Sequence, residues 1–473
     1  MFVGREHELE VLERLYNRGR FQMAVVYGRR RVGKTALLDE FSRDKDTLFF
    51  TAQQKSDAIN LRSFSQAVYR FFDLPITTGS FATWEDALTF IAERSRDGKP
   101  RVFVFDELPY AAQAQPALPS TLQIAIDHAF KTTNVCMILC GSNEGFMESS
   151  VLGKKSPLYG RRNAQIKLSP FDYYDAARLM PACSSAERIV RYAAFGGTPY
   201  YLEQVEEGEP LEESLRRLFF DMAGVLYAEP DMLLRQELRE PALYSSILDA
   251  VAAGATSPKI IADKAGVDEG SVGKYLKTLS GLGLIERVVP LGEGATSRKG
   301  VYRIKDPFFA FWYRFVSPYT GAIEAGAGDA VALRASGQEL ATYVGKQFEL
   351  VCLQWLMRLN RTGRLPFLAS EFGAWWGTDP RQREQVDIDV IAADPRGRAI
   401  VFGECKWREH VNETETIETL VRRAELIKGY RDKRYVVFSK QAASEGTSHK
   451  IDAREDLSWV TPDDLYDGLE GEA

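Results

Sequence analysis

The segment from Gly28 to Thr35 constrains the fold of this chain more than any other. Its sequence, Gly-Arg-Arg-Arg-Val-Gly-Lys-Thr, fits the pattern G-x-x-x-x-G-K-[ST]. The apolar run 23–27 precedes it and the helix-forming run 36–41 follows it, which is the context that a phosphate-binding loop needs. In such a loop Lys34 reaches the β- and γ-phosphates and the threonine hydroxyl holds Mg²⁺. The segment therefore predicts a nucleoside triphosphate site made of Gly28, Arg29, Arg30, Arg31, Val32, Gly33, Lys34 and Thr35.

Three further apolar runs, 47–51, 102–105 and 135–140, alternate with helical patterns. Strands that are apolar on both faces and alternate with helices indicate a parallel sheet with helices on both sides. The expected fold class is therefore α/β multidomain, beginning with a P-loop NTPase sheet. Asp106 and Glu107 directly follow the run 102–105, at the strand end where open α/β sheets bind ligands.

These two acids and three later residues are the candidates for nucleotide chemistry. We expect Asp106 to hold Mg²⁺ and Glu107 to polarise the water that attacks the γ-phosphate. Asn143 would contact that phosphate or orient the water, or it would cap the following turn. Arg161 or Arg162 would act as an arginine finger, in cis or from a neighbouring subunit, or would form a structural ion pair.

The length of 473 residues predicts several domains. Residues 170–239 lose the strand pattern and indicate a helical lid over the nucleotide. Three short helical patterns and two strand patterns then predict a winged helix, with 271–279 as its reading helix. Residues 241–305 hold nine Lys and Arg against six Asp and Glu in a chain of net charge −6, which is compatible with a DNA-facing module. A winged helix that serves only as a protein-packing spacer is the open alternative. The expected domains are the ATPase core 1–169, the lid 170–239, the winged helix 240–305, an aromatic helix and linker 306–332, and a C-terminal domain 333–473.

The C-terminal domain shows a predicted order α-β-β-β-α-β, from a helix around Glu349 through strands near 367–372, 386–392 and 399–407 to a helix 413–430 and a strand 434–438. Alternation along a strand sends Glu404 and Lys406 to one face. We expect Asp389 and Glu404 to bind Mg²⁺ from adjacent strands, with Asp387 as a substitute ligand. Glu349 would complete or orient the metal site, and Lys406 would position or deprotonate the attacking water.

Two resemblances follow from these motifs. The chain resembles the archaeal-type ATPases of the AAA+/STAND P-loop NTPases in three features: the start Phe2–Glu6, the phosphate loop, and the acid pair Asp106-Glu107. The resemblance extends along the chain as far as the winged helix and the aromatic segment 306–316. This resemblance implies an ATP-binding, ATP-hydrolysing switch or motor, with ATP rather than GTP. Glu349, Asp389, Glu404 and Lys406 resemble the site of the PD-(D/E)XK nucleases, which cut DNA or RNA with Mg²⁺, although Val386-Asp387-Ile388-Asp389 lacks their Pro-Asp step.

The expected cofactors are thus ATP and Mg²⁺, and the expected partner is nucleic acid, DNA rather than RNA. A nuclease-like fold that only binds is the alternative, in which ATP regulates a DNA- or protein-binding module. No apolar run approaches the ~20 residues that span a bilayer, and the five cysteines lack C-x-x-C pairs. With no secretory signal at the start, we expect the cytoplasm and no membrane partner. A homo-oligomer is left open.

Overall fold

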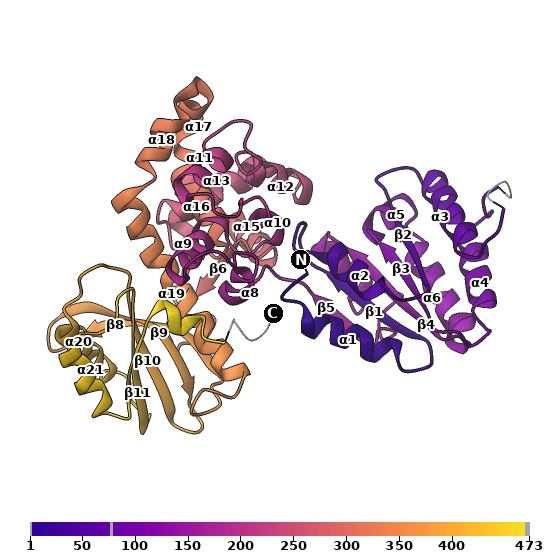
Figure 1. The fold of residues 1–473 in the computed structure, drawn as a ribbon. Helices are drawn as coiled ribbons and strands as arrows, with labels where there is room; N and C mark the ends of the chain where they lie inside the picture. Colours follow the sequence, from indigo (N-terminus) through magenta and orange to yellow (C-terminus); the bar gives the residue numbers. More distant parts are fainter. Residues whose placement is uncertain (1, 76–78, 469–473) are drawn as a thin grey trace. The chain divides into compact units, whose positions relative to one another are not determined.

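The computed structural model describes residues 2–75 and 79–468, which form two compact units divided after Pro170. The first unit is built on a five-stranded parallel sheet of order β2-β3-β4-β1-β5 (Figure 1). The predicted parallel α/β sheet is therefore confirmed. Its strands are β1 (Gln22–Tyr27), β2 (Thr47–Thr51), β3 (Arg101–Asp106), β4 (Val135–Gly141) and β5 (Ala164–Lys167).

Alternating side chains of the strands pack the two faces of this sheet. Met23 and Val25 of β1 join the cluster under the helices α3 to α6, whereas Ala24 and Val26 join the cluster under α1 and α2. Both faces are therefore buried, which explains why the strands are continuous apolar runs. The helices are α1 (Glu6–Tyr16), α2 (Lys34–Ser42), α3 (Asp57–Phe71), α4 (Trp84–Arg94), α5 (Leu108–Ala114) and α6 (Leu118–His128).

The edge strand β5 was not expected from the sequence. It pairs in parallel with residues 24–27 of β1, and of its four residues only Ile166 is buried. A short edge strand with one buried side chain carries neither a continuous apolar run nor a full alternation, so pattern analysis could not find it.

The second unit begins with helices and continues into a winged-helix segment, residues 241–304. This segment has three helices and an antiparallel ribbon, in which residues 285–288 pair with 301–304. The helices before it are α8 (Tyr173–Ala177), α9 (Ser185–Phe195), α10 (Pro199–Leu202), α11 (Leu211–Phe219) and α12 (Glu229–Glu237). The segment itself comprises α13 (Pro241–Ala252), α14 (Pro258–Ala265), α15 (Glu269–Gly281), β6 (Ile285–Val288) and β7 (Val301–Ile304).

The segment 321–332, expected as a linker after the aromatic helix, is helical instead. It follows α16 (Pro307–Phe315) as α17 (Thr320–Ala322), a π-helical turn and α18 (Gly328–Arg334). A Cβ on Gly328 would lie 1.9 Å from the carbonyl oxygen of Phe220, next to α11. The small residues therefore permit close packing of α18 on α11 rather than free movement of a linker.

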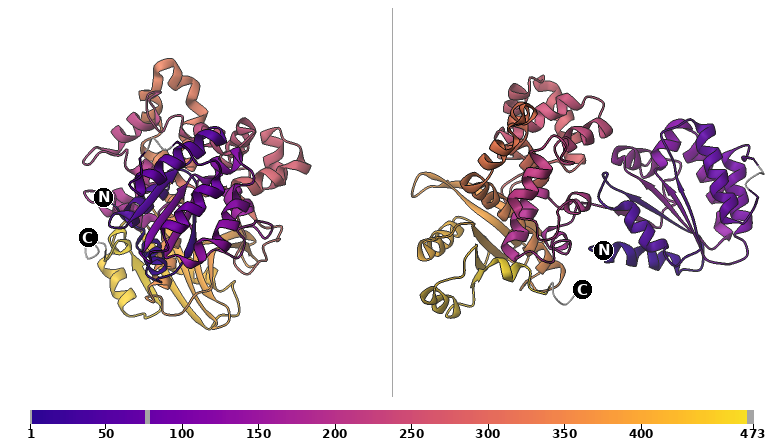
Figure 2. Two further views of the ribbon diagram at one scale, coloured as in Figure 1. Left: turned by 90° about the vertical axis from the view of Figure 1, so that its right-hand side faces the viewer. Right: turned by 45° about the horizontal axis from the view of Figure 1, so that its top comes forward.

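The C-terminal sheet has the order β12-β11-β10-β9-β8, with β8, β9 and β10 antiparallel and β10, β11 and β12 parallel. The long helix α19 (Gly337–Arg361) packs on one face and α20 (Glu413–Ala424) on the other (Figures 1 and 2). The expected order α-β-β-β-α-β is present, but the first strand begins at Glu371, and α21, β12 and α22 were not expected. These elements are β8 (Glu371–Asp379), β9 (Glu384–Asp394), β10 (Ala399–Lys406), β11 (Asp432–Ser439), α21 (Glu445–Asp452), β12 (Leu457–Val460) and α22 (Pro462–Leu465).

The wing of the winged-helix segment, residues 289–300, is attached to this sheet. The backbone N–H of Leu291 donates to the carbonyl oxygen of Ala374 in β8 at 2.9 Å. The Leu291 side chain also packs against the apolar cluster that includes Trp375. The wing is thus part of the packing of the second unit. None of the helices in the two described ranges is both long and apolar enough to cross a membrane.

Candidate functional sites

The phosphate loop has a backbone that depends on its glycines. Gly33 has φ 90°, in the left-handed region that favours glycine, and it precedes the first residue of α2. A Cβ on Gly28 would lie 2.2 Å from the carbonyl oxygen of Leu168. Any side chain at position 28 would therefore separate the loop from the chain that follows β5.

Lys34 and Thr35 occupy the first turn of α2. The Lys34 side chain is buried, and its Nζ donates to the carbonyl oxygens of Gly28 at 2.8 Å and Arg29 at 3.0 Å. Thr35 is exposed at the N-terminus of the helix, where a phosphate is stabilised by free N–H groups and the helix dipole. The amine thus lies inside the loop, and the hydroxyl lies at its surface.

Arg5 holds the loop from the start of the chain. It is buried, and its Nη2 donates to the carbonyl oxygens of Val32 at 3.0 Å and Ser169 at 2.7 Å. No role for Arg5 was predicted from the sequence, in which residues 2–6 only contribute to a family resemblance. No local pattern links Arg5 to a loop more than twenty residues later.

Asp106 and Glu107 lie at the carboxyl end of β3, beside the loop. Asp106 is buried, and this burial raises the pKa of its carboxyl group. Glu107 has φ 50°, a left-handed backbone that costs a non-glycine residue about 1–2 kcal/mol. Its Oε2 accepts hydrogen bonds from the Ser142 hydroxyl at 2.9 Å and the Ser142 N–H at 3.3 Å. Ser142, just after β4, was missed, although a polar residue at that strand end was an available signal.

Asn143 forms a helix cap. Its Oδ1 accepts the N–H of Phe146 at 2.8 Å, at the start of the short helix α7 (Glu144–Phe146). The capping alternative considered from the sequence is thus present. The Asn143 amide N–H groups could still donate to a phosphate, because the cap uses only the side-chain oxygen.

For Arg161 the structure shows the ion pair that the sequence left open as the alternative to an arginine finger. Arg161 and Arg162 directly precede β5, which runs parallel to β1. They therefore lie at the end of the sheet where β1 begins, and Arg161 lines a surface pocket there together with Gln22, the first residue of β1. The phosphate loop follows the other end of β1, and a six-residue strand separates these edges by roughly 20 Å. Arg161 instead pairs with Asp127 on α6, with Nη2 to Oδ2 2.5 Å, and holds the pKa of Asp127 well below its usual range. Because the two arginines follow β4 in the sequence, they could have stayed near its carboxyl end, where the phosphate loop lies. The sequence does not show that the chain returns to the opposite end of the sheet before β5.

A second polar site lies in a cavity of about 650 Å³ between α19, α20 and the C-terminal sheet. Alternation along β10 turns Glu404 and Lys406 to one face, and Lys406 Nζ donates to Glu404 Oε1 at 2.5 Å. Cys405 points the other way, toward Cys352 of α19. The acidic and basic side chains that line the cavity are Lys346, Glu349, Asp387, Asp389, Glu404, Lys406, Arg408 and Arg423.

Asp389 reaches this cavity from an irregular stretch of β9. Between its pairings with Trp375 and Gly373 of β8, β9 advances three residues where β8 advances two. Such an extra residue is a β-bulge, which redirects a side chain. Asp389 Oδ2 accepts the N–H of Cys405 at 2.8 Å, just beyond the last pair of β9 with β10. Burial and the neighbouring carboxylates, Glu404 first, raise the pKa of Asp389 to about 7.

Arg423 of α20 is a further cation at this site, and it was not predicted from the sequence. Its Nη1 lies 3.7 Å from Glu404 Oε2 and donates to the Asp387 backbone oxygen at 2.9 Å. Glu404 Oε2 is buried and accepts no hydrogen bond. In the described ranges, no three Asp, Glu, His or Cys side chains are arranged as a ready metal site. A cation here would therefore be held by the two strand carboxylates together with water or a substrate phosphate, as is usual for Mg²⁺.

Glu349 approaches the cavity from α19. Its carboxylate pairs with Lys346 Nζ, with Oε2 at 2.8 Å and Oε1 at 3.0 Å. Burial raises the pKa of Glu349, and the nearby cations Lys346 and Arg303 oppose this rise. Arg303 belongs to β7, so the winged-helix segment contributes charge to this site. The structure thus brings Glu349, Asp389, Glu404 and Lys406 to one cavity.

Two family models match the chain. Residues 2–205 match an ATPase domain found predominantly in Archaea, and residues 312–417 match a family of archaeal and bacterial proteins of unknown function. The first match agrees with the loop and the acid pair described above. The N-terminal part is thus an ATPase domain of the P-loop NTPase type.

The chain is also similar to individual proteins and to a solved structure. The uncharacterized ATP-binding protein MJ0423 of Methanocaldococcus jannaschii is 51% identical over 45 residues, 10% of this chain and 76% of that protein. The Walker-type ATPase of Pyrococcus abyssi superposes with a TM-score of 0.51 at 19% identity, over 66% of this chain and 96% of that chain, which shows a shared fold alone. The uncharacterized protein MJECL04 of Methanocaldococcus jannaschii is 31% identical over 409 residues, 86% of this chain and 88% of that protein. With that identity over nearly the whole of both proteins, this chain belongs to the family of MJECL04, and its N-terminal part is the archaeal ATPase domain.

Proposed function

We propose that this protein is an ATP-hydrolysing switch of the AAA+/STAND group that couples its nucleotide state to the binding or Mg²⁺-dependent cleavage of nucleic acid, DNA rather than RNA. The observation that carries the proposal is the presence in one chain of a phosphate loop beside Glu107 and a cavity that gathers Asp389, Glu404 and Lys406. The first site supports nucleotide hydrolysis, and the second supports phosphodiester chemistry.

At the nucleotide site each residue has one task. Lys34 exchanges its bonds to the loop carbonyls for the β- and γ-phosphates, and loop N–H groups enclose the β-phosphate. Thr35 and Asp106 would hold Mg²⁺, which neutralises phosphate charge when bound. Glu107 orients the attacking water and accepts its proton, while Ser142 fixes the carboxylate.

In the C-terminal cavity, Asp389 and Glu404 would hold Mg²⁺ and Glu349 would orient the metal site, a layout that resembles the PD-(D/E)XK nucleases. Lys406 would position the attacking water. The fit is supported by the buried oxygen of Glu404 that accepts no hydrogen bond, and by the burial and the neighbouring carboxylates that raise the pKa of Asp389. A cation between these groups would relieve both the missing bond and the like-charge repulsion.

A second candidate function has its own observation. Lys406 and Arg423 already neutralise Glu404 from both sides, at 2.5 Å and 3.7 Å. A carboxylate balanced by two cations has less need of a metal ion, which favours a cavity that binds nucleic acid or protein under ATP control and cuts nothing.

The test is cleavage of plasmid and linear DNA with Mg²⁺, with and without ATP, by the wild type, Lys34→Ala and Lys406→Ala. Phosphate release is measured in the same tubes. The proposal expects Lys406→Ala to lose cleavage and keep ATP hydrolysis, and Lys34→Ala to lose hydrolysis. ATP hydrolysis by the wild type without any cleavage would favour the second candidate, and no hydrolysis at all would overturn the ATPase role.

A further inference from the structure

A cavity of about 380 Å³ lies beside the acidic cavity, between the winged-helix segment, α16 and α19. The two cavities share the lining residues Thr342 and Lys346. Both belong to the second unit. A ligand in the smaller cavity would therefore lie next to any phosphate held at Asp389 and Glu404.

The charged side chains of the smaller cavity are mostly basic. Arg303 pairs with Glu286 across the ribbon, with Nε to Oε1 2.7 Å. Lys305 and Arg314 are exposed and form no ion pair within residues 2–75 and 79–468. The charged side chains that line the cavity are Glu286, Arg303, Lys305, Arg314 and Lys346. The cavity is thus suited to an anion.

The remaining lining is largely apolar and includes Tyr302, Ile304 and Leu350. Inorganic phosphate would not use this surface, whereas a nucleotide presents both a phosphate and an aromatic base. We infer that this cavity takes one unpaired nucleotide of a nucleic-acid strand, with Lys305 and Arg314 on its phosphate and its base on the apolar lining. The inference rests on the proposed function, since it supplies the substrate class for the acidic cavity.

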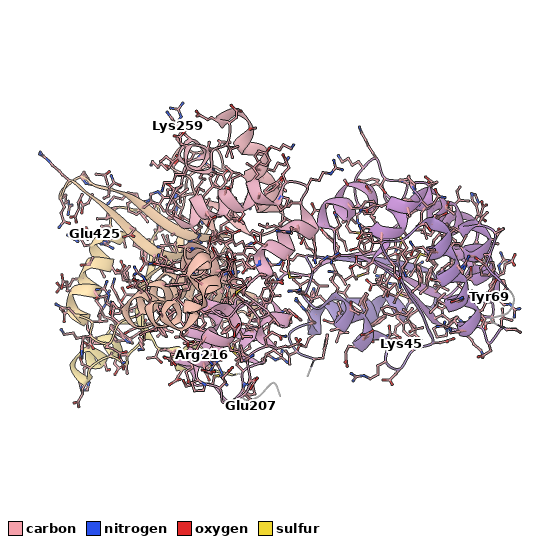
Figure 3. The ribbon with its side chains drawn as sticks, turned by 90° about the horizontal axis from the view of Figure 1, so that it is seen from above. Lys45, Tyr69, Glu207, Arg216, Lys259 and Glu425 are labelled. Atoms are coloured by element: carbon pink, nitrogen blue, oxygen red, sulfur yellow. The ribbon has the colours of Figure 1, made fainter. Side chains whose placement is uncertain are left out.

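The nucleotide must be unpaired because a base in a duplex is stacked and cannot enter a concave site. Other basic residues of the winged-helix segment lie on its outer surface, such as Lys259 at the start of α14 (Figure 3). A single exposed lysine on a helix does not by itself indicate a binding site for nucleic acid. Lys305 and Arg314 differ because they border a cavity that continues to the carboxylates.

The test is fluorescence anisotropy of the full chain with labelled single-stranded and duplex DNA, at several salt concentrations. EDTA prevents metal-dependent cleavage, and a repeat with Mg²⁺ and ATP covers ATP-dependent binding. Two variants address the cavity: Lys305→Ala with Arg314→Ala, which removes charge, and Thr342→Trp at an exposed lining position, which fills space. Their matched controls are Lys428→Ala with Lys450→Ala, which also removes two charges, and Met357→Trp on α19. All three positions are exposed and outside the two cavities.

The double variant is expected to bind the single strand roughly tenfold more weakly, with a slope of log affinity against log salt about 1.4 shallower. Thr342→Trp is expected to weaken the single strand as well, and the controls to match the wild type. Wild-type binding of DNA with no loss in either cavity variant would overturn this inference and leave the proposed function standing. Losses confined to the duplex would also overturn it. A wild type that binds neither DNA would instead contradict the nucleic-acid part of the proposed function.

Discussion

At the scale of single residues, Glu107 shows how the ATPase domain positions its chemistry. Its backbone lies in a left-handed conformation, and two hydrogen bonds from Ser142 fix its carboxylate. The strain of the backbone is offset by a side chain that reaches across from β3 to the end of β4. Ser142 is therefore a positioning residue for Glu107.

Glu107→Gln is expected to lower ATP hydrolysis about 100-fold or more, because a general base contributes 10²–10⁴-fold. ATP affinity should stay within about twofold, since the amide keeps the side-chain shape and a hydrogen bond to Ser142. Phosphate release and titration with a fluorescent ATP analogue measure the two quantities. Glu10→Gln, on the exposed surface of α1, is the control. Wild-type hydrolysis by Glu107→Gln would contradict the assigned role.

Arg161→Ala is expected to leave ATP hydrolysis unchanged in dilute protein, because Arg161 lies at the far edge of the sheet and pairs with Asp127. The free energy of unfolding should fall by no more than about 1 kcal/mol, since the pair is partly exposed. Asp127→Asn should have the same small effect in chemical denaturation. A loss of hydrolysis that grows with protein concentration would instead indicate a finger acting in trans.

The sequence predicted the place of some site residues in the fold, because the segments that position them are their neighbours along the chain. Lys34 follows its loop directly, and Asp106 ends an apolar strand, so local pattern and context specify both. Arg423 gave no signal, because only the packing of α20 brings its side chain to Glu404. Arg303 was missed for the same reason, since it reaches Glu349 from a different domain of the sequence.

At the scale of elements, α16 connects several helices of the second unit. The Phe311 ring lies 4.8 Å from that of Phe219 on α11 and 5.8 Å from that of Tyr343 on α19. The aromatic helix expected in 306–316 is present and packs between these helices, whereas the helical packing of 321–332 was hidden by its small residues. Small residues resemble a linker in composition, and only contact with α11 distinguishes the two.

Asp306→Ala is expected to lower the free energy of unfolding of the second unit by about 1–2 kcal/mol. Asp306 caps α16 by accepting the N–H groups of Phe308 at 2.9 Å and Phe309 at 3.4 Å, and it is buried. Asp306→Asn keeps the acceptor and should lose much less. Thermal unfolding followed by circular dichroism compares the variants, and equal losses in both would contradict the capping explanation.

At the scale of the whole molecule, the proposed switch requires coupling between the nucleotide site and the nucleic-acid site. The winged-helix segment and the C-terminal sheet lie in one compact unit, and the phosphate loop lies in the other. If the nucleotide state acts on the second unit, it would act on the winged helix and the acidic cavity together, because both belong to that unit.

Linkage makes this coupling measurable in both directions. If ATP changes DNA affinity by a given factor, DNA must change ATP affinity by the same factor. In Glu107→Gln, where hydrolysis is suppressed, we expect equal factors of roughly 5–150-fold, the usual range of allosteric coupling. DNA titrations with and without ATP, and ATP titrations with and without DNA, give the two values. Factors of one in both directions would contradict the switch, with Lys34→Ala as the control without nucleotide.

The attachment of the wing has a consequence for any cleavage product. Leu291 joins the wing to β8, and β8 pairs with the strand that carries Asp389, so the wing is attached to the sheet that bears the carboxylates of the proposed site. A strand held by the winged helix would then be cut at a set offset from the bound nucleotides, and its fragments would share one end position rather than a distribution of ends.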